Sequence, residues 1–143
     1  MYNNENTIKI RELSCGIVAV RYAGGDWQLL VLRTIAVWDF PKSVITPNED
    51  AQEAAQRITA EQTGITDLDF VFGEDYKETV PNADNKVSRY YVAETRTAEI
   101  ILSLSPAGKP QDWRWVTCDE AEDLLPPRLA QVLEWIRGRI NEG

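Results

Sequence analysis

Apolar residues near the N-terminus form two long runs that are typical of strands. The first run, Leu13–Tyr22, and the second, Trp27–Arg33, are rich in Val, Ile and Leu, and the residues between them contain a Gly-Gly-Asp turn signal. This arrangement predicts a β-hairpin. Because the apolar positions are nearly continuous rather than alternating, we expect both strands to be covered on both faces.

Residues 38–65 follow a different pattern, in which a proline-containing loop leads into one helix. Pro41 and Pro47 keep the loop out of helical geometry, because proline fixes φ and biases the preceding residue toward extended conformations. Residues 48–50 (Asn-Glu-Asp) offer capping oxygens and negative charge, and Gly64 supplies a stop. Small residues on the apolar stripe predict close packing of this helix on a sheet. The stripe consists of Ala51, Ala54, Ala55 and Ile58.

The second half of the chain predicts three more strands and two more helices. Thr117 and Glu120 have the spacing of a capping box, and Pro126 and Pro127 end the helix that begins there. The order of strands and helices predicts a single mixed α/β domain over residues 1–143, with helices that cover a sheet. The first predicted strand lies within Asp67–Thr79, around Leu68–Phe72, and an extension to Tyr76 is left open. The other predicted strands lie at Val87–Glu94 and Trp113–Thr117, and the last helix spans Arg128–Ile140.

Charge argues against a nucleic-acid-binding protein. The formal net charge is −8, whereas a domain that binds a nucleic acid duplex usually carries a basic face. The acidity is uneven, because residues 1–48 carry a net +1 and the remainder a net −9. An anionic ligand would therefore be met by the N-terminal part or by individual lysines and arginines.

Residue types and segments that the sequence lacks limit the kinds of site and the location that we expect. The chain has no histidine, which excludes catalytic His dyads and zinc sites that need imidazole. The two cysteines, Cys15 and Cys118, form no metal-binding pattern, so we expect reduced thiols. No apolar stretch is long enough to span a membrane, and the N-terminus lacks a signal peptide. We therefore expect a cytoplasmic protein with a flexible start at residues 1–10.

The helix and its preceding loop resemble the Nudix box. The signature of the Nudix hydrolase superfamily is G-x5-E-x7-R-E-U-x-E-E-x-G-U, where U is a bulky apolar residue. Residues 43–65 match this signature in part. The matching residues are Glu49, Arg57, Glu61, Gly64 and Ile65, and the departures are Ser43, Ile58, Thr59 and Gln62.

The flanking residues extend the resemblance over about residues 12–138. Trp38–Lys42 (WDFPK) looks like the W-x-F-P-K that precedes the box in the branch that hydrolyses diadenosine tetraphosphate. Ser14–Gly16 and Trp113–Trp115 resemble the first and a late strand of the same branch. The resemblance implies a Nudix, MutT-like fold, an α/β/α sandwich with a mixed β-sheet between helices.

The resemblance also implies a reaction, in which water attacks a nucleotide pyrophosphate held by Mg²⁺ or Mn²⁺. Family members bind the metal through glutamates at the positions of Ile58, Glu61 and Gln62, so only Glu61 keeps its carboxylate. The backbone carbonyl of Ser43 stands where the family uses a glycine carbonyl. A further family carboxylate aligns with Lys109-Pro110 and is also missing.

Other residues of the resemblance have structural or binding roles. Glu49, Arg57 and Gly64 are structural in the family. Glu61 also has a purely structural interpretation, in which it forms a salt-bridge ladder with Glu53 and Arg57. The structural interpretation of Ile58 is packing in the core. The residues that the resemblance implies as substrate contacts are Lys42, Tyr76, Lys86 and Arg89, and a solvated loop lysine is the alternative for Lys42.

Three hypotheses follow. In the first, the protein is a hydrolase of (di)nucleoside polyphosphates whose Mg²⁺- or Mn²⁺-dependent activity is weakened or lost by the changes in its box. In the second, it is an inactive Nudix-fold module that needs no metal and binds a nucleotide or another protein. In the third, it is a Nudix-fold structural subunit that binds no ligand. We expect a small-molecule nucleotide partner, no nucleic acid duplex and no membrane partner, and monomer and homodimer both stay open.

Overall fold

Seven strands form one mixed sheet at the centre of the protein. The structure is a computed structural model that describes residues 12–103 and 110–142. The path β3-β2-β1-β6-β5 crosses the sheet, with β4 paired to β1 and β7 paired to β2. The β1–β6 pair is parallel and the other pairs are antiparallel. The strands are β1 (Glu12–Ala23), β2 (Asp26–Thr34), β3 (Val37–Asp39), β4 (Lys42–Val44), β5 (Tyr76–Glu78), β6 (Lys86–Glu94) and β7 (Asp112–Val116).

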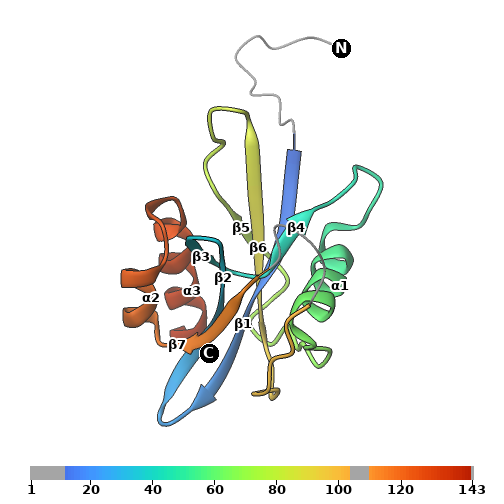
Figure 1. Ribbon diagram of the computed structural model, residues 1–143. Helices are drawn as coiled ribbons and strands as arrows, with labels where there is room; N and C mark the ends of the chain where they lie inside the picture. Colours follow the sequence, from blue (N-terminus) through green and yellow to red (C-terminus); the bar gives the residue numbers. More distant parts are fainter. Residues whose placement is uncertain (1–11, 104–109, 143) are drawn as a thin grey trace.

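Helices cover both faces of this sheet (Figure 1). Helix α1 (Ala51–Thr63) packs on one face, and α2 (Cys118–Leu124) and α3 (Ala130–Glu142) pack on the other, joined by a 3-10 turn at Pro127–Leu129. The expected α/β/α sandwich is therefore confirmed. Among the described residues, no helix is long and apolar enough to cross a membrane.

The two faces of β1 and β6 belong to two different parts of the core. Val18, Val20 and Tyr90 pack with α2 and α3, whereas Cys15 and Tyr91 pack with Ala55 of α1. The alternation follows from the pleat, which points successive side chains to opposite faces. The prediction that the first strands are covered on both faces is confirmed, because residues Cys15–Val20 are all buried.

Local sequence determines both ends of α1. Asp50 is the N-cap, and its side chain accepts a hydrogen bond from the backbone N–H of Glu53. Gly64 ends the helix with φ of 80°, a left-handed conformation that glycine adopts without steric cost. The predicted capping box is also present, because Thr117 and Glu120 satisfy each other's backbone N–H groups before α2.

Three sequence predictions need correction. No regular strand forms at Leu68–Phe72, where the backbone makes one isolated bridge between Asp69 and Glu94, and the strand that borders β6 is β5 instead. The loop before α1 contains two short strands, β3 and β4. The last α-helix begins two residues later than expected, after the 3-10 turn. The predicted flexible start at residues 1–10 and the alignment of Lys109 lie outside the described residues.

Gly16 of β1 permits the close approach of the loop that precedes α1. A Cβ atom at this position would overlap the carbonyl oxygen of Pro41 and lie 2.8 Å from Cβ of Lys42. The same segment carries a hydrogen bond from the Ile17 N–H to the Pro41 carbonyl at 3.3 Å. The absence of a side chain at Gly16 therefore sets how near Lys42 can come to the sheet.

We expect Gly16→Ala to destabilise the fold by about 2–3 kcal/mol, because the added methyl group forces β4 away from β1. Urea unfolding measures this change. Gly138→Ala in α3 is the matched control, since a Cβ there meets no atom within 4 Å. The control should raise stability by about 0.5–1 kcal/mol through helix propensity. Equal effects of the two substitutions would contradict the close approach at Gly16.

Candidate functional site

Arg57 joins the ends of the Nudix-like box. Its guanidinium lies 2.8 Å from the Glu49 carboxylate and 3.3 Å from the Glu61 carboxylate. The backbone N–H of Thr46 also donates to Glu49. That backbone hydrogen bond and the Arg57 contact together hold the pKa of Glu49 below its usual range. The sequence predicted a salt-bridge ladder of Glu53, Arg57 and Glu61. In the structure, Glu49 takes the place of Glu53, and Glu61 belongs to the ladder as predicted.

The two other metal positions of the box face the protein interior. Ile58 is 2% exposed, as expected for a core residue. Gln62 is also buried, and its Nε2 donates to the backbone carbonyl of Lys42 at 3.0 Å. This hydrogen bond fastens α1 to β4, at the place where the family signature would put a carboxylate. The neighbouring Ser43 is exposed and pairs with Cys15 of β1.

A charged cluster lies beside Gln62, on the face of the sheet that α3 covers. Asp39 is its centre, and Oδ2 of Asp39 lies 2.6 Å from Arg128 Nη2 and 3.4 Å from Lys42 Nζ. Oδ1 accepts hydrogen bonds from the Tyr90 hydroxyl at 2.8 Å and from the Phe40 N–H at 2.6 Å. Burial and the Asp39 charge both raise the pKa of Tyr90 well above its usual value, so Tyr90 stays a neutral donor.

This cluster carries a net charge of +1, since two cations share one carboxylate. Lys42 Nζ also donates to Ser88 Oγ at 2.9 Å, and the Lys42 side chain remains 26% exposed. The Arg128 side chain is 45% exposed. Two cations that are both fixed and accessible can contact an anionic group. Next to them is a cavity of about 220 Å³, lined by Leu32, Thr34, Asp39, Phe40, Lys42, Gln62 and Pro110.

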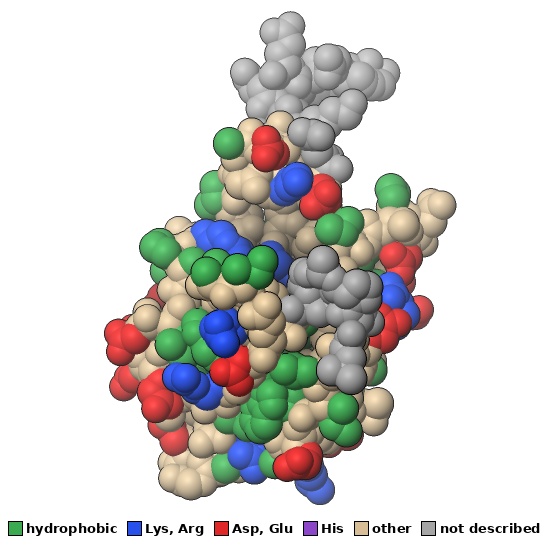
Figure 2. All heavy atoms as spheres, in the orientation of Figure 1, with side chains coloured by type: hydrophobic (Ala, Val, Ile, Leu, Met, Phe, Trp, Pro, Cys, Tyr) green, Lys and Arg blue, Asp and Glu red, His purple; other side chains and the backbone are tan. Residues whose placement is uncertain are grey.

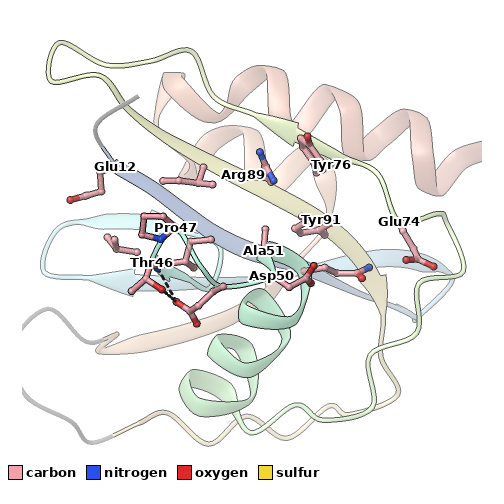
Figure 3. A pocket seen from close by; sticks show the side chains of 14 residues that line it. Glu12, Thr46, Pro47, Asp50, Ala51, Glu74, Tyr76, Arg89 and Tyr91 are labelled. Atoms are coloured by element: carbon pink, nitrogen blue, oxygen red, sulfur yellow. Dashed lines mark hydrogen bonds between the residues drawn. The ribbon is translucent and has the colours of Figure 1, made fainter. Parts of the chain in front are cut away.

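The structure does not bring all four predicted substrate residues together. Lys42 belongs to the charged cluster, but Arg89 and Tyr76 lie on the α1 side of the sheet and line a second cavity of about 710 Å³. Figure 3 shows Arg89 beside Tyr76 and Tyr91 in that cavity. Lys86 lies at the start of β6, where its Nζ is 3.9 Å from the Glu12 carboxylate. The pleat of β6 separates these residues, because Ser88 and Arg89 point to opposite faces.

Sequence reasoning missed Asp39 and Arg128. Asp39 lies inside the WDFPK segment, and its position between Trp38 and Phe40 in that segment was a usable signal. Arg128 contacts Asp39 from 89 residues away in the sequence, and the chain offers no local pattern that joins them. Only the packing of the turn before α3 against the loop before β4 places the two groups together.

Comparison with known proteins decides the family. The NUDIX domain family matches residues 11–136. The chain belongs to the Nudix family. Among its Nudix relatives is the asymmetrical bis(5'-nucleosyl)-tetraphosphatase of Rattus norvegicus, 30% identical over 109 residues, which cover 74% of this chain and 69% of the relative. The Caenorhabditis elegans enzyme of the same name is 26% identical over 114 residues, which cover 76% of this chain and 80% of the relative.

Solved structures show the same Nudix fold. A binary complex of C. elegans Ap4A hydrolase matches with a TM-score of 0.77 at 21% identity, covering 92% of this chain and 99% of that chain. The NUDIX domain of Shewanella oneidensis NrtR, complexed with ADP ribose, matches with a TM-score of 0.70 at 16% identity. The second match covers 96% of this chain and 94% of the NrtR domain.

Nudix hydrolases generally use divalent metal ions, which prefer several carboxylate oxygens. Within residues 12–103 and 110–142, no group of three or more acidic, His or Cys side chains could hold such an ion. At the box positions, Ile58 is apolar, Gln62 is neutral and Glu61 is paired with Arg57. The residues present therefore do not fit a bound divalent ion.

The visible surface agrees with the charge argument made from the sequence. Figure 2 shows Lys and Arg side chains scattered among Asp and Glu side chains on one face of the molecule. They do not gather into a broad basic area on the part of that face that belongs to described residues. An anionic ligand would therefore contact individual Lys and Arg side chains rather than a broad basic surface. Two of these side chains, Lys42 and Arg128, are held in place by the buried Asp39 carboxylate.

Proposed function

We propose that this Nudix protein binds a nucleoside or dinucleoside polyphosphate, and that its metal-dependent pyrophosphohydrolase activity is weak or lost. The observation that carries the proposal is the contact of Gln62 with the Lys42 carbonyl, beside buried Ile58. At this point of the box an ion would require charged oxygen ligands, and the chain supplies an amide and a hydrocarbon.

The charged cluster supports the binding half of the proposal. Lys42 and Arg128 present accessible cations on the side of β4 next to Gln62, and Asp39 fixes both of them. A phosphate oxygen is a strong acceptor for such charged donors. Relatives agree with this ligand class, since two are named as bis(5'-nucleosyl)-tetraphosphatases and one Nudix domain is complexed with ADP ribose.

Binding and turnover, measured in parallel, test the proposal. We expect ATP and diadenosine tetraphosphate to bind with equal affinity in EDTA and in Mg²⁺ or Mn²⁺, because Lys42 and Arg128 supply the positive charge. Hydrolysis should be slower than that of an ordinary Nudix enzyme by a factor of about 10² or more, as expected when a general base and metal stabilisation are both missing. Turnover at ordinary enzyme rates would contradict the proposal and favour the active-hydrolase hypothesis.

Substitution of Lys42 locates the binding site. Lys42→Gln should weaken ATP binding about three- to tenfold, as expected for the loss of one partly exposed charged hydrogen bond. Lys42→Arg keeps the charge and should retain most of the affinity. Lys77→Gln on β5, outside the charged cluster, is the matched control and should leave binding unchanged. If Lys42→Gln binds ATP as well as the unchanged protein does, the site lies elsewhere.

A further inference from the structure

Asp39 lines the 220 Å³ cavity beside the charged cluster, but its carboxylate is already fully used. Oδ1 accepts hydrogen bonds from the Tyr90 hydroxyl and the Phe40 N–H. Oδ2 lies 2.6 Å from Arg128 and 3.4 Å from Lys42. A carboxylate offers about four lone-pair sites, so these partners satisfy it. Asp39 therefore has no capacity to accept a hydrogen bond from a ligand, and it acts on a ligand only through its charge.

The Asp39 carboxylate is also held in one place. Its side chain is 12% exposed, whereas those of Lys42 and Arg128 are 26% and 45% exposed. The donors to Oδ1 are a backbone N–H and the hydroxyl of Tyr90, a fully buried residue. An anion can contact the outer sides of the two cations, but it cannot displace Asp39 without leaving these two buried donors unpaired.

The cavity has one charge of each sign on its wall. Among the described residues that line it, Lys42 is the only cation and Asp39 is the only carboxylate. A phosphate oxygen that accepts a hydrogen bond from Lys42 Nζ lies no more than about 6 Å from Asp39 Oδ2, because both oxygens contact the same nitrogen. Like charges at this separation repel each other, and the repulsion grows with the charge of the ligand.

We propose that Asp39 is a specificity-determining residue, which limits the preference of the site for longer phosphate chains. Because it concerns the same site, this role rests on the proposed function. Lys42 and Arg128 supply two positive charges, and Asp39 leaves a net +1 for the ligand. Each phosphate added to a nucleotide increases its attraction to the cations and its repulsion from Asp39 together. The affinity therefore rises only slowly from AMP to ATP.

A purely structural role for Asp39 makes the opposite prediction. If the carboxylate only holds Lys42 and Arg128 in place, its loss frees both side chains. Binding then weakens, because the ligand has to immobilise them again. A charge effect instead strengthens binding when Asp39 is made neutral. The sign of the change in affinity separates the two roles.

Calorimetric titration of Asp39→Asn with AMP, ADP and ATP in EDTA tests the charge effect. The asparagine Oδ1 still accepts from Tyr90 and the Phe40 N–H, whereas its neutral amide removes the negative charge. We expect the affinity for ATP to rise about tenfold and that for AMP about two- to threefold, because the lost repulsion scales with ligand charge. Asp119→Asn, which neutralises an 89% exposed carboxylate on α2, is the matched control and should leave both affinities unchanged.

A second substitution measures the coupling between Asp39 and Lys42. Lys42→Gln should weaken ATP binding more in the Asp39→Asn background than in the unchanged protein, because Asp39 no longer offsets the Lys42 charge. Added salt should also weaken ATP binding more steeply in Asp39→Asn. Circular dichroism checks that the variants are folded. Asp39→Ser, which presents no amide group to the two cations, replaces Asp39→Asn if that variant does not fold, and the same gain in affinity is expected.

Weaker or unchanged ATP binding in the neutral variant would overturn the role of Asp39. An equal gain in Asp119→Asn would do the same, because it would reflect the charge of the whole protein. Both results leave the proposed function intact as long as the unchanged protein binds ATP. Failure of the unchanged protein and of Asp39→Asn alike to bind ATP would contradict the proposed function, and the role of Asp39 with it.

Discussion

The double variant Ile58→Glu/Gln62→Glu is expected to bind Mn²⁺, whereas the unchanged protein is not. In the variant, α1 would carry carboxylates at positions 58, 61 and 62, and the side chain at position 62 would lie against the Lys42 carbonyl, which now accepts the Gln62 amide. Without metal, the new carboxylate at position 62 repels that carbonyl oxygen, so the variant should be less stable. An ion bound between them removes the repulsion, and Mn²⁺ at 100 times its Kd should stabilise the variant by about 2.7 kcal/mol.

Thermal unfolding with and without Mn²⁺ measures this gain. For a domain of this size, we expect a rise in Tm of roughly 5–12 °C. Gln52→Glu/Gln56→Glu is the matched control, because it adds the same charge to the same helix away from the Lys42 carbonyl. No Mn²⁺ effect in the Ile58/Gln62 variant, or an equal effect in the control, would show that the metal position is misplaced.

Loss of Asp39 is expected to be the most damaging single change in the charged cluster. Asp39→Ala leaves the buried Tyr90 hydroxyl and the Phe40 N–H without their acceptor, and it leaves Arg128 beside Lys42 without a shared anion. We expect a loss of about 3 kcal/mol or more, since each buried donor left unpaired costs about 1–3 kcal/mol. Solvent reaches Arg128 and Lys42, which limits the part of the loss that comes from their charges.

Denaturant unfolding of Asp39→Ala, Tyr90→Phe and the double variant checks this interpretation. Because the two groups share one hydrogen bond, their effects should not add, and the double variant should lose less than the sum of the single losses. Asp119→Ala is the control, since Asp119 bonds Arg137 at 89% exposure and should matter by less than about 0.5 kcal/mol. Additive losses would argue that Asp39 does not hold Tyr90.

The sequence predicted most elements because their signals are local. Asp50, Gly64 and the Thr117–Glu120 box act within one helical turn, and the structure confirms all three. The strand placed at Leu68–Phe72 was wrong for the opposite reason. Its side chains are apolar enough for a strand, but the backbone finds a partner only where Asp69 meets Glu94. Strand formation depends on a neighbouring strand, which a local pattern does not reveal.

The site was predictable only where it follows the family signature. The spacing of Glu49, Arg57 and Glu61 identified the box, and the structure joins these three residues through ion pairs. The charged cluster depends on Arg128, which comes from the far end of the chain. The separation of Lys42 from Arg89 depends on the pleat of β6, so a list of expected ligand residues could not show that they belong to opposite faces.

The parallel pairing of β1 with β6 also determines the order in which the chain can fold. Its register joins Glu12 to Lys86 and Val20 to Glu94, so the centre of the sheet closes a loop that contains all of α1. The β1–β2 hairpin needs only the short turn before Asp26. Closing a long loop costs more conformational entropy than closing a short one, and pairing across it is therefore slower. We expect the hairpin to form first and β6 to be added late. Until then one edge of β1 is unpaired, which makes this interval the period in which a newly made chain is most open to association with another copy.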